Sequence, residues 1–360
     1  MIRNIEAELQ TIIPTRIISG LNVVFNDKKS EKEIIDFPLS TYETPLFASV
    51  SRGVKVSNKC PISVVVLSSC MTRSVVFQCK NLLDVQKSLD LLEKVSSKFQ
   101  DIVAKTSKHC KFQNFEKWVV GTLLYVRFSY DVSEASGHNM TTIATNEIAK
   151  FFVEEVKNAG IFIEYISNSA NVCCDKKVSA VNHVCGRGKN VIAEMIVDKK
   201  TCEEILHTTP EKIVNLNIKK NLIGSIIGGS ICSANAHYAN MLAGMFLPLG
   251  QDIANIVEGS QGITYCNLTD DGDLYFSVNL PNIICGCVGN GKNLDFVVEN
   301  LKMIGCRDGE GKVIEQASER MAGIIGAVVL CGELSLMSAL TNQDELVKSH
   351  LALERGTRNR

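Results

Sequence analysis

The sequence predicts an α+β protein in which a large mixed α/β domain carries a smaller inserted domain. Residues 75–167 show strand and helix patterns in the order β-α-β-β-α-β, the split βαβ arrangement of ferredoxin-like folds. The segments on both sides are richer in glycine and small residues and are long enough for a core of their own. We therefore assign residues 1–74 and 168–350 to the large domain, 75–167 to the insert, and 351–360 to a polar C-terminal tail.

The elements of the insert follow from the spacing of its apolar residues. The helices repeat apolar positions at helical spacing, whereas the strands are short runs rich in β-branched and aromatic residues. The pattern predicts a strand at 74–80, a helix at 81–106, strands at 108–117 and 118–131, a helix at 141–160 and a strand at 161–167. No internal repeat or low-complexity segment disturbs this order.

Composition argues against several classes of protein. The 38 basic and 39 acidic side chains give a net charge of −1, so no field would recruit nucleic acid or an anionic membrane. Fourteen cysteines follow no disulfide framework, and we interpret them as reduced thiols of a cytoplasmic protein. The most apolar window, 321–340, is interrupted by Glu333 and small residues, and the N-terminus lacks a signal-peptide pattern. These features predict a soluble chain without a membrane span.

The segment NSANVCCDKKVSA at 168–180 places two adjacent thiols beside Asp175, Lys176 and Lys177. No C-x-x-C motif occurs and no histidine lies at zinc-finger spacing, so we expect buried structural cysteines and no metal site. A D-K-K triplet is commonly a solvated surface feature, but small and apolar residues flank this one. A desolvated lysine can stabilise a developing oxyanion, which makes a site for a reacting carbonyl the alternative interpretation.

Three further ionisable residues, Glu43, Asp252 and His350, stand alone in apolar or small-residue surroundings. An exposed position is the ordinary interpretation, and the pattern alone does not bring them to the lysine. No G-x-G-x-x-G follows a predicted strand, so a Rossmann nucleotide site is not supported. Although such stretches are more often plain turns, backbone able to hold a phosphate occurs at 136–140, 186–190 and 286–294.

Four longer motifs carry a more specific signal. They are CDKKVSAVNHVCGRGKNV at 174–191, NLIGSIIGGSICSANAHYANMLAGMFLPLGQDIA at 221–254, NIICGCVGNGKNL at 282–294 and GELSLMSALTNQDELVKSH at 332–350. Together they closely resemble the hydroxymethylglutaryl-coenzyme A (HMG-CoA) reductase family, and the resemblance runs almost continuously from about residue 38 to residue 350. The D-K-K form and the SGHNM stretch resemble the eukaryotic-type class, which uses NADPH, more than the bacterial class, which uses NADH.

The resemblance implies an enzyme that reduces HMG-CoA to mevalonate, a precursor of isoprenoids and sterols, with two NADPH consumed and coenzyme A released. It implies that Lys176 stabilises the oxyanion and that Glu43 is the catalytic glutamate. Asp252 would be a buried aspartate that bridges these two residues, and His350 would protonate the departing thiolate. Burial and the neighbouring Asp252 would raise the pKa of Glu43, so that it could donate a proton.

Binding roles are carried over from the same resemblance. Substrate contacts are implied at Arg73, Ser169, Asp175, Lys177, Lys220 and Asn240, and coenzyme A contacts at Arg52 and His237. The nicotinamide cofactor would contact Glu134, Ser136, Gly137, Asn139, Met140, Gly286, Gly289 and Gly291. The expected assembly is a homodimer or a dimer of dimers with the active site across the interface, because the glycine-rich loop and the lysine segment would face each other from different subunits.

The sequence departs from the family pattern at several places. Glu134 stands where the family has an aspartate, and Gly356 stands where it has a regulatory phosphoserine. A family motif expected upstream of residue 38 is not recognisable. We also expect this chain to lack the membrane anchor of animal members. Two alternatives therefore stay open. One is an NADH-dependent enzyme of the same fold that degrades mevalonate, and the other is a catalytically degenerate homologue that binds coenzyme A.

Overall fold

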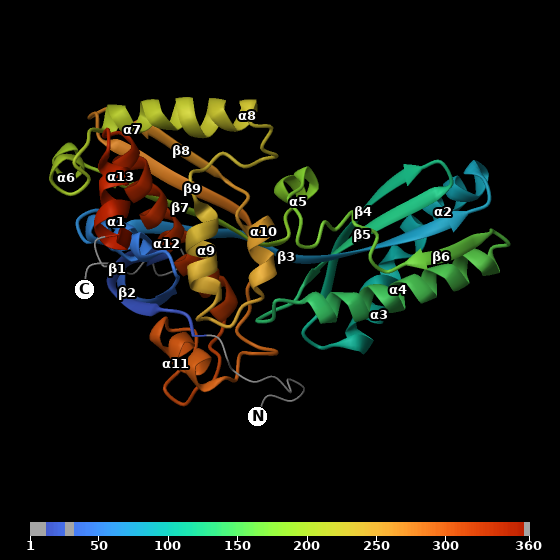
Figure 1. Ribbon diagram of the computed structural model, residues 1–360. Coiled ribbons are helices and arrows are strands. Elements are labelled where there is room, and N and C mark those ends of the chain that lie inside the picture. The colour runs from blue at the N-terminus through green and yellow to red at the C-terminus, as the bar shows by residue number, and fades with distance from the viewer. Residues whose placement is uncertain (1–11, 26–31, 356–360) are drawn as a thin grey trace.

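The computed structural model describes residues 12–25 and 32–355, which form two unequal parts joined by the long strand β3 (Ile62–Cys79), as Figure 1 shows. The described strands belong to one mixed sheet of nine strands that runs through both parts. Gly356, the position compared above with a phosphoserine, lies outside the described residues. The fold is therefore mixed α/β, as the sequence predicts at this level.

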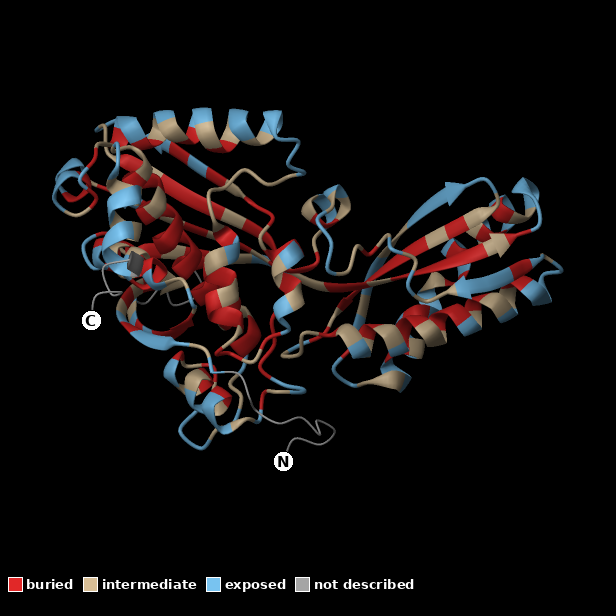
Figure 2. Ribbon diagram, viewed as in Figure 1, coloured by how far each residue is buried: buried red, intermediate tan, exposed pale blue. Residues whose placement is uncertain are grey.

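The larger part is built on six neighbouring strands. Their order is β2 (Lys32–Ser40), β1 (Thr15–Phe25), β3, β7 (Gly188–Val197), β9 (Leu274–Ile283) and β8 (Ile263–Leu268). The β1–β3 pair is parallel, and the other neighbours are antiparallel. Figure 2 shows the buried residues of this part gathered between the sheet and its helices.

The central helix α12 (Ala317–Leu340) packs against the sheet, α1 (Thr44–Ser57) and α9 (Tyr238–Phe246). Its approach to α1 requires a glycine, because a Cβ at Gly53 would lie 2.2 Å from the carbonyl oxygen of Cys331. Within the described residues, α12 is the one helix long and apolar enough to cross a membrane, but 89% of its most apolar window is buried inside the structure. Such burial is typical of the core helix of a globular protein.

The smaller part has its own core around four strands in the order β6 (Ile163–Ser167), β3, β5 (Leu123–Asp131) and β4 (Lys111–Val120). The helices α2 (Leu82–Val95), α3 (Phe99–Thr106) and α4 (His138–Asn158) pack with this sheet. Figure 1 shows them along one side of the strands. Two separate sets of buried residues, one in each part, thus flank the junction that β3 crosses.

The structure corrects three predicted boundaries. The strand expected at 74–80 is the second half of β3, so the expected domain boundary falls inside a continuous strand. The helix expected at 81–106 is interrupted by a 3₁₀ turn at Ser96–Lys98, where two serines favour bonds to nearby backbone. The hairpin between β4 and β5 turns at Gly121, which has a φ of +57°, rather than before Trp118.

The remaining elements connect these layers. They are α5 (Ala180–Cys185), α6 (Lys199–Glu204), α7 (Pro210–Leu216), η2 (Asn217–Gly224), α8 (Ser225–Ile227), η3 (Ile253–Asn255), α10 (Ile256–Gly259), α11 (Asp295–Met303), α13 (Glu345–His350) and η4 (Leu351–Arg355). The first five residues of the expected polar tail therefore continue α13 as a π-helical turn. All fourteen cysteines are free, and Cys173 is buried.

Candidate active site

A cavity of about 820 Å³ opens at the junction of the two parts. We call it the Lys176 cavity. Segments far apart in sequence form its wall: β3, the start of α4, the D-K-K loop, the turn before η3 and the glycine-rich loop. The lining residues are Arg73, Ala135, Ser136, Gly137, His138, Asn139, Met140, Thr142, Asp175, Lys176, Gly250, Gln251, Asp252, Val288, Gly289, Asn290, Gly291 and Lys292.

The D-K-K loop has an unusual backbone that buried polar groups hold in place. Cys174 and Lys176 have φ values of +45° and +56°, in the left-handed region that side chains disfavour. The Nδ2 of Asn182 donates to the carbonyl oxygen of Cys174 at 3.1 Å, and the amide of Lys176 donates to Oε1 of Glu258 at 3.0 Å. Since Glu258 is fully buried, it fixes the backbone from which the Lys176 side chain extends.

Lys176 and Asp252 form an ion pair at the cavity wall. Nζ of Lys176 lies 2.8 Å from Oδ2 of Asp252, and the two side chains are 40% and 43% exposed. The hydrogen bond that the Lys176 ammonium donates to the Asp252 carboxylate raises the pKa of Lys176, so this side chain stays protonated at neutral pH. Burial is the largest single influence and acts to raise the pKa of Asp252, but the hydrogen bonds from Lys176 and from the amide of Ala254, together with the charge of Lys176, make the net shift downward. The expectation of a buried Asp252 is therefore wrong, because water reaches this pair.

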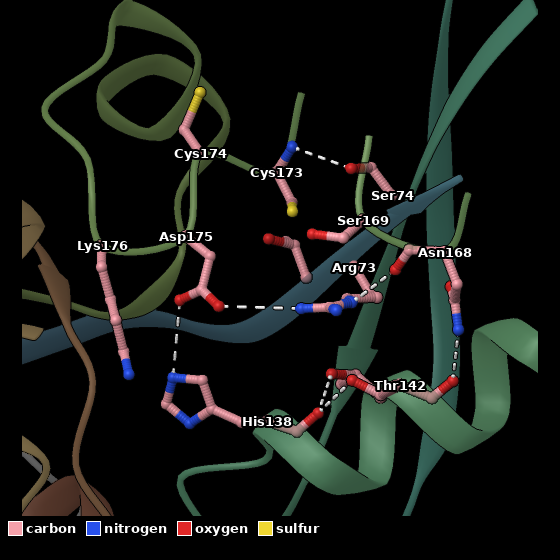
Figure 3. Close-up of polar contacts among 12 residues, drawn as sticks. Arg73, Ser74, His138, Thr142, Asn168, Ser169, Cys173, Cys174, Asp175 and Lys176 are labelled. Atoms are coloured by element: carbon pink, nitrogen blue, oxygen red, sulfur yellow. Dashed lines mark hydrogen bonds and ion pairs between the residues drawn. The ribbon is translucent and has the colours of Figure 1, made fainter. Parts of the chain in front are cut away.

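Asp175 is the centre of a second group of charged contacts, and Figure 3 shows those with Arg73 and His138. Its carboxylate lies 2.7 Å from Nη2 of Arg187, 3.7 Å from Nη1 of Arg73 and 3.7 Å from Nε2 of His138. Arg187 is 1% exposed and also donates to the carbonyl oxygen of Thr72 at 2.6 Å, so its position is fixed. Burial, followed by the charge of Arg187, lowers the pKa of His138 to about 4. The His138 imidazole is thus neutral at pH 7.

A second polar group surrounds the start of α9, and we call it the Glu43 cluster: Glu43, His237, Asn240 and Glu333. Oε2 of Glu43 accepts a hydrogen bond from Nδ2 of Asn240 at 3.1 Å, and this nitrogen lies 3.3 Å from Nδ1 of His237. Nε2 of His237 lies 2.8 Å from the carbonyl oxygen of Gly332. The histidine therefore donates through Nε2 and accepts through Nδ1.

Glu333 supports this cluster from the middle of α12. It is fully buried and accepts from the amide of Ala236 at 2.6 Å, the amide of His237 at 3.0 Å and the hydroxyl of Thr264 at 2.8 Å. Carboxylates are favoured at such positions because the amides at a helix N-terminus have no partner within the helix. Lys220 is close enough for the charge of Glu333 to act on it, although burial lowers its pKa overall.

The C-terminal helix α13 packs beside α1. Nη1 of Arg52 lies 2.7 Å from Oε1 of Glu345, and Nη2 donates to the carbonyl oxygen of Ser335 at 2.6 Å. Arg52 and His350 both line a small cavity of about 190 Å³. Arg52, for which a coenzyme A contact is expected, thus lies near His350, the expected proton donor to the thiolate. Neither residue lines the Lys176 cavity.

The structure brings only part of the predicted set together. Within the described residues, no hydrogen bond or ion pair joins Glu43 to Lys176 or Asp252, so the expected bridge through Asp252 is wrong for one chain. The two residues lie in different places in the fold. Glu43 stands just before α1, which packs against α12, whereas Asp252 stands just before η3 at the junction of the two parts. The glycine-rich loop and the lysine segment line one cavity of the same chain, so the stated reason for an interface between them is also wrong.

Four other predicted residues lie outside the lining of the Lys176 cavity. Oε2 of Glu134 accepts from the amide of Ser318 at 2.6 Å, where α12 begins. Gly286 serves packing, since a Cβ there would lie 2.3 Å from the amide nitrogen of Ser136. Lys177 is exposed and donates to the carbonyl oxygen of Asp175, and Ser169 is exposed near Arg73 (Figure 3).

Sequence reasoning missed several residues of this site. They include His138, Arg187, Lys292 and Glu333, which stand inside the stretches quoted above. Glu333 was noted only as a break in an apolar window, and nothing in the pattern indicated a role in the site for any of the four. Glu258 lies four residues beyond the end of one motif, and the residues beside it give no signal of a functional site. Within the described residues, no group of three or more His, Cys, Asp or Glu side chains is placed to hold a metal ion.

A lysine–carboxylate pair beside a cavity with a glycine-rich wall defines a class of protein: an enzyme that polarises a bound substrate while holding a phosphate-bearing cofactor. The chain belongs to the hydroxymethylglutaryl-coenzyme A reductase family, whose model matches residues 13–355. This confirms the family predicted from the four motifs.

Individual relatives agree with this assignment. The chain is 40% identical to the 3-hydroxy-3-methylglutaryl-coenzyme A reductase of Methanocaldococcus jannaschii, over 99% of this chain and 85% of that protein. It is 37% identical to the enzyme of the same name from Pyrococcus horikoshii, over 98% of this chain and 84% of that protein. A solved structure of the Streptococcus pneumoniae reductase matches the fold with a TM-score of 0.69 at 16% identity, over 93% of this chain and 86% of that one. A second structure, described as the class II enzyme bound to NADPH in open conformations, matches with a TM-score of 0.69 at 15% identity, over 95% of this chain and 78% of that one.

Proposed function

We propose that this chain is a reductase that converts HMG-CoA to mevalonate in two reductions with NADPH and releases coenzyme A. Membership of the family supports the reaction. The observation that carries the proposal is the 2.8 Å ion pair between Lys176 and Asp252 at the wall of a cavity of about 820 Å³. A cavity of this size is within the range of cofactor and substrate sites.

The residues around the cavity fit a dinucleotide. Gly289 has a φ of +109° and no atom within 4 Å of the place a Cβ would occupy, so its backbone faces open space. The segment 134–136 is bonded to the glycine-rich loop through the Ala135–Val288 bridge, which makes one continuous wall. The residues that would hold the cofactor are Ser136, Gly137, Asn139, Met140, Gly289 and Gly291. When bound, the cofactor supplies hydride.

Lys176 is the proposed electrophile. When hydride adds to the thioester carbonyl, negative charge develops on its oxygen, and the protonated Lys176 can donate a charge-assisted hydrogen bond there. By comparison with single oxyanion-hole donors, this contact contributes about 3 kcal/mol to lowering the barrier. Asp252 keeps Lys176 charged and aimed at the cavity. Arg73, held by Asn168 and Asp175, offers its remaining N–H groups to the substrate carboxylate.

Two protons must also be delivered, and we assign them to His350 and Glu43. The collapsing hemithioacetal releases a thiolate that His350 would protonate, and reduction of the aldehyde leaves an alkoxide that Glu43 would protonate. Because neither residue lines the Lys176 cavity, we further propose a homodimer in which one subunit brings Glu43 and His350 to the Lys176 of the other. Apolar side chains exposed by 46% to 81% support an interface along η2, α8 and the residues that follow, at Ile218, Ile223, Ile226, Ile227 and Ile231.

Two structural assignments belong to the same proposal. The strand order β6-β3-β5-β4 with packed helices supports a ferredoxin-like domain at 75–167, inserted into a large domain of 1–74 and 168–350. The free cysteines support a cytoplasmic location, where thiols stay reduced.

Turnover of HMG-CoA with NADPH tests the function, with Lys176→Met as the decisive variant. Methionine keeps an unbranched stem but removes the charge, so we expect turnover to fall roughly 10²- to 10³-fold, as when an oxyanion donor is lost. The thermal unfolding midpoint should change little, because Lys176 is 40% exposed. Normal turnover in the variant would contradict the role of the lysine.

The same assay separates the alternatives. A wild-type protein that binds coenzyme A but turns over nothing would be a degenerate homologue. A kcat/KM for mevalonate oxidation with NADH above that for HMG-CoA reduction with NADPH would instead indicate a degradative enzyme. We expect the reductive direction with NADPH to have the higher value.

A further inference from the structure

The side chains that line the Lys176 cavity carry more positive than negative charge. Arg73 lies 3.7 Å from Asp175, and Lys176 lies 2.8 Å from Asp252, so each of these cations has a carboxylate partner. His138 is neutral at pH 7, since burial and Arg187 lower its pKa to about 4. Lys292 is the remaining charged residue of the lining. Among the described residues, no carboxylate lies within 4.0 Å of its ammonium group.

Lys292 is also nearly enclosed. It is 5% exposed, and its Nζ donates to the carbonyl oxygen of Gly250, which lines the same cavity. Its backbone is held as well, because Nη2 of Arg307 donates to its carbonyl oxygen at 2.9 Å and its own amide donates to Gly289 at 3.2 Å. A carbonyl partner compensates only part of the desolvation of an ammonium ion. Burial accordingly lowers the pKa of Lys292.

We propose that Lys292 binds a phosphate group of the nicotinamide dinucleotide. This inference rests on the proposed function, and it assigns a specific contact to a residue that neither the motif nor the resemblance singled out. An anionic phosphate at the glycine-rich loop would supply the counter-charge that the protein does not. The compact charge of a lysine ammonium commonly binds phosphate groups. The open space in front of Gly289 lets a phosphate approach the loop closely.

The chain offers a matched control in Lys189. This lysine is 2% exposed, and its Nζ also donates to a backbone carbonyl, that of Cys285, at 3.1 Å. It does not line the Lys176 cavity. The two lysines therefore share burial and partner type but differ in access to the cavity. Lys189→Met reports what the loss of a buried lysine does to the fold, and Lys292→Met adds the loss of the phosphate contact.

Binding of NADPH to the intact protein, followed by the fluorescence of the reduced nicotinamide, is the first measurement. We expect Lys292→Met to raise the Kd roughly ten- to a hundredfold, the effect of losing one charge-assisted hydrogen bond. Lys292→Arg should recover most of the affinity, and Lys189→Met should keep the wild-type Kd. An unchanged Kd in Lys292→Met, or equal weakening in Lys189→Met, would overturn the proposal.

Thermal unfolding gives a readout that does not depend on the nicotinamide. Inorganic pyrophosphate should raise the unfolding midpoint of the wild type and of Lys189→Met, and should not raise that of Lys292→Met. A rise of the same size in Lys292→Met would overturn the proposal. Without ligand, Lys292→Met should unfold at no lower temperature than the wild type, because it removes a buried charge that lacks a carboxylate partner. A lower midpoint would count against an unpaired cation.

Comparison of NADPH with NADH identifies which phosphate is bound. Equal weakening of both cofactors by Lys292→Met indicates the diphosphate, and weakening of NADPH alone indicates the 2′-phosphate. Either result supports the proposal. If the wild type binds neither cofactor, the proposed function fails as a whole, whereas wild-type binding that Lys292→Met does not alter rejects only the role of Lys292.

Discussion

The Lys176 cavity and the Glu43 cluster are each supported by a buried glutamate, Glu258 or Glu333, that accepts hydrogen bonds from backbone amides, but they differ in what their other charges face. In the cavity, Lys176 and Asp252 form a pair that is about two-fifths exposed, and the pair borders a space of about 820 Å³. In the cluster, Glu333 is fully buried, and its carboxylate accepts hydrogen bonds from the backbone amides just before α9. The first region is therefore arranged to meet a ligand, and the second to hold its own backbone.

This difference explains why the predicted catalytic residues separate into two groups. One chain completes the lysine–aspartate pair, whereas Glu43 and His350 lie on helices that pack against α12. If the proposed assembly is correct, the acids act on a substrate held mainly by the other subunit. The comparison can be tested by changing one region at a time and asking which half of the reaction responds.

The largest effect is expected at His350, which has one task in one half of the reaction. His350→Gln should slow reduction of the thioester roughly 10²- to 10⁴-fold, as for other general acids, and should leave reduction of free mevaldehyde nearly unchanged because no thiolate forms. Glu43→Gln should impair mevaldehyde reduction instead. Steady-state rates for both substrates with NADPH give this crossed pattern.

Misfolding would lower both rates together, so the pattern contains its own control. Equal damage to both half-reactions in His350→Gln would mean that the histidine holds α13 in place rather than donating a proton. Glu345→Gln separates the two ideas, because Glu345 lies on α13 with His350 and the change weakens its 2.7 Å contact with Arg52 of α1 but leaves the imidazole intact.

An intermediate effect is expected at Glu258, which positions Lys176 through its backbone. Glu258→Leu removes the acceptor of the Lys176 amide, so the Lys176 ammonium should no longer be held in the correct position. We therefore expect kcat to fall roughly 10- to 100-fold with little change in KM. Glu258→Gln retains an oxygen at the same place and should recover much of kcat. The measurement is kcat and KM for HMG-CoA at saturating NADPH.

Stability must be followed in the same variants, because Glu258 also lies 3.5 Å from the buried Arg187. Glu203→Gln, at an exposed position of α6, is the matched surface control and should behave as the wild type. If Glu258→Gln and Glu258→Leu have the same kcat at temperatures where both are folded, the oxygen does not position Lys176.

The smallest effect is expected on stability, at His138. Its folded pKa of about 4 lies below the pKa of about 6.5 that is usual for histidine, so between these values the unfolded chain binds a proton that the folded protein does not. The free energy of unfolding should therefore fall as the pH falls from about 6.5 to about 4, by roughly 1–3 kcal/mol for this group, and should not change further below that range.

Replacing the imidazole should remove this contribution. Urea unfolding at about pH 7.5 and about pH 5 should show a smaller loss of stability for His138→Asn than for the wild type. His109→Asn, at an exposed position, controls for the loss of a histidine as such. Equal pH dependence in His138→Asn and the wild type would show that His138 is not held neutral.

Local patterns were sufficient for much of the smaller part of the protein. The helix α4 lies within three residues of its expected bounds, because its apolar positions recur at helical spacing over several turns. The hairpin turn at Gly121 was placed four residues too early, since the apolar run of β4 continues to its last residue and hides the break. Boundaries set by backbone conformation are weakly encoded where side chains on both sides are alike.

In the candidate site, too, the sequence indicated some features and only the packing of the chain decided others. The motif around Lys176 could be recognised because a lysine among small residues is rare and the resemblance is long. That Asp252 is its partner, at 2.8 Å and accessible to water, depends on the packing of η3 against the D-K-K loop. The pattern predicted Lys292 only as part of a glycine-rich loop, and only the packed cavity shows that no carboxylate of the described part of the chain lies within 4.0 Å of its ammonium group.

The sequence by itself determined the kinds of element, the reactive side chains and the family, because these depend on spacing along the chain and on residue type. The tertiary structure alone decided which charges meet, which remain unpaired and which lie apart. The physical reason is that the energy of a charge depends on its distance to other charges and to water. In this protein those distances join segments such as 175–176 and 250–252, which are far apart along the chain and become neighbours only when it folds.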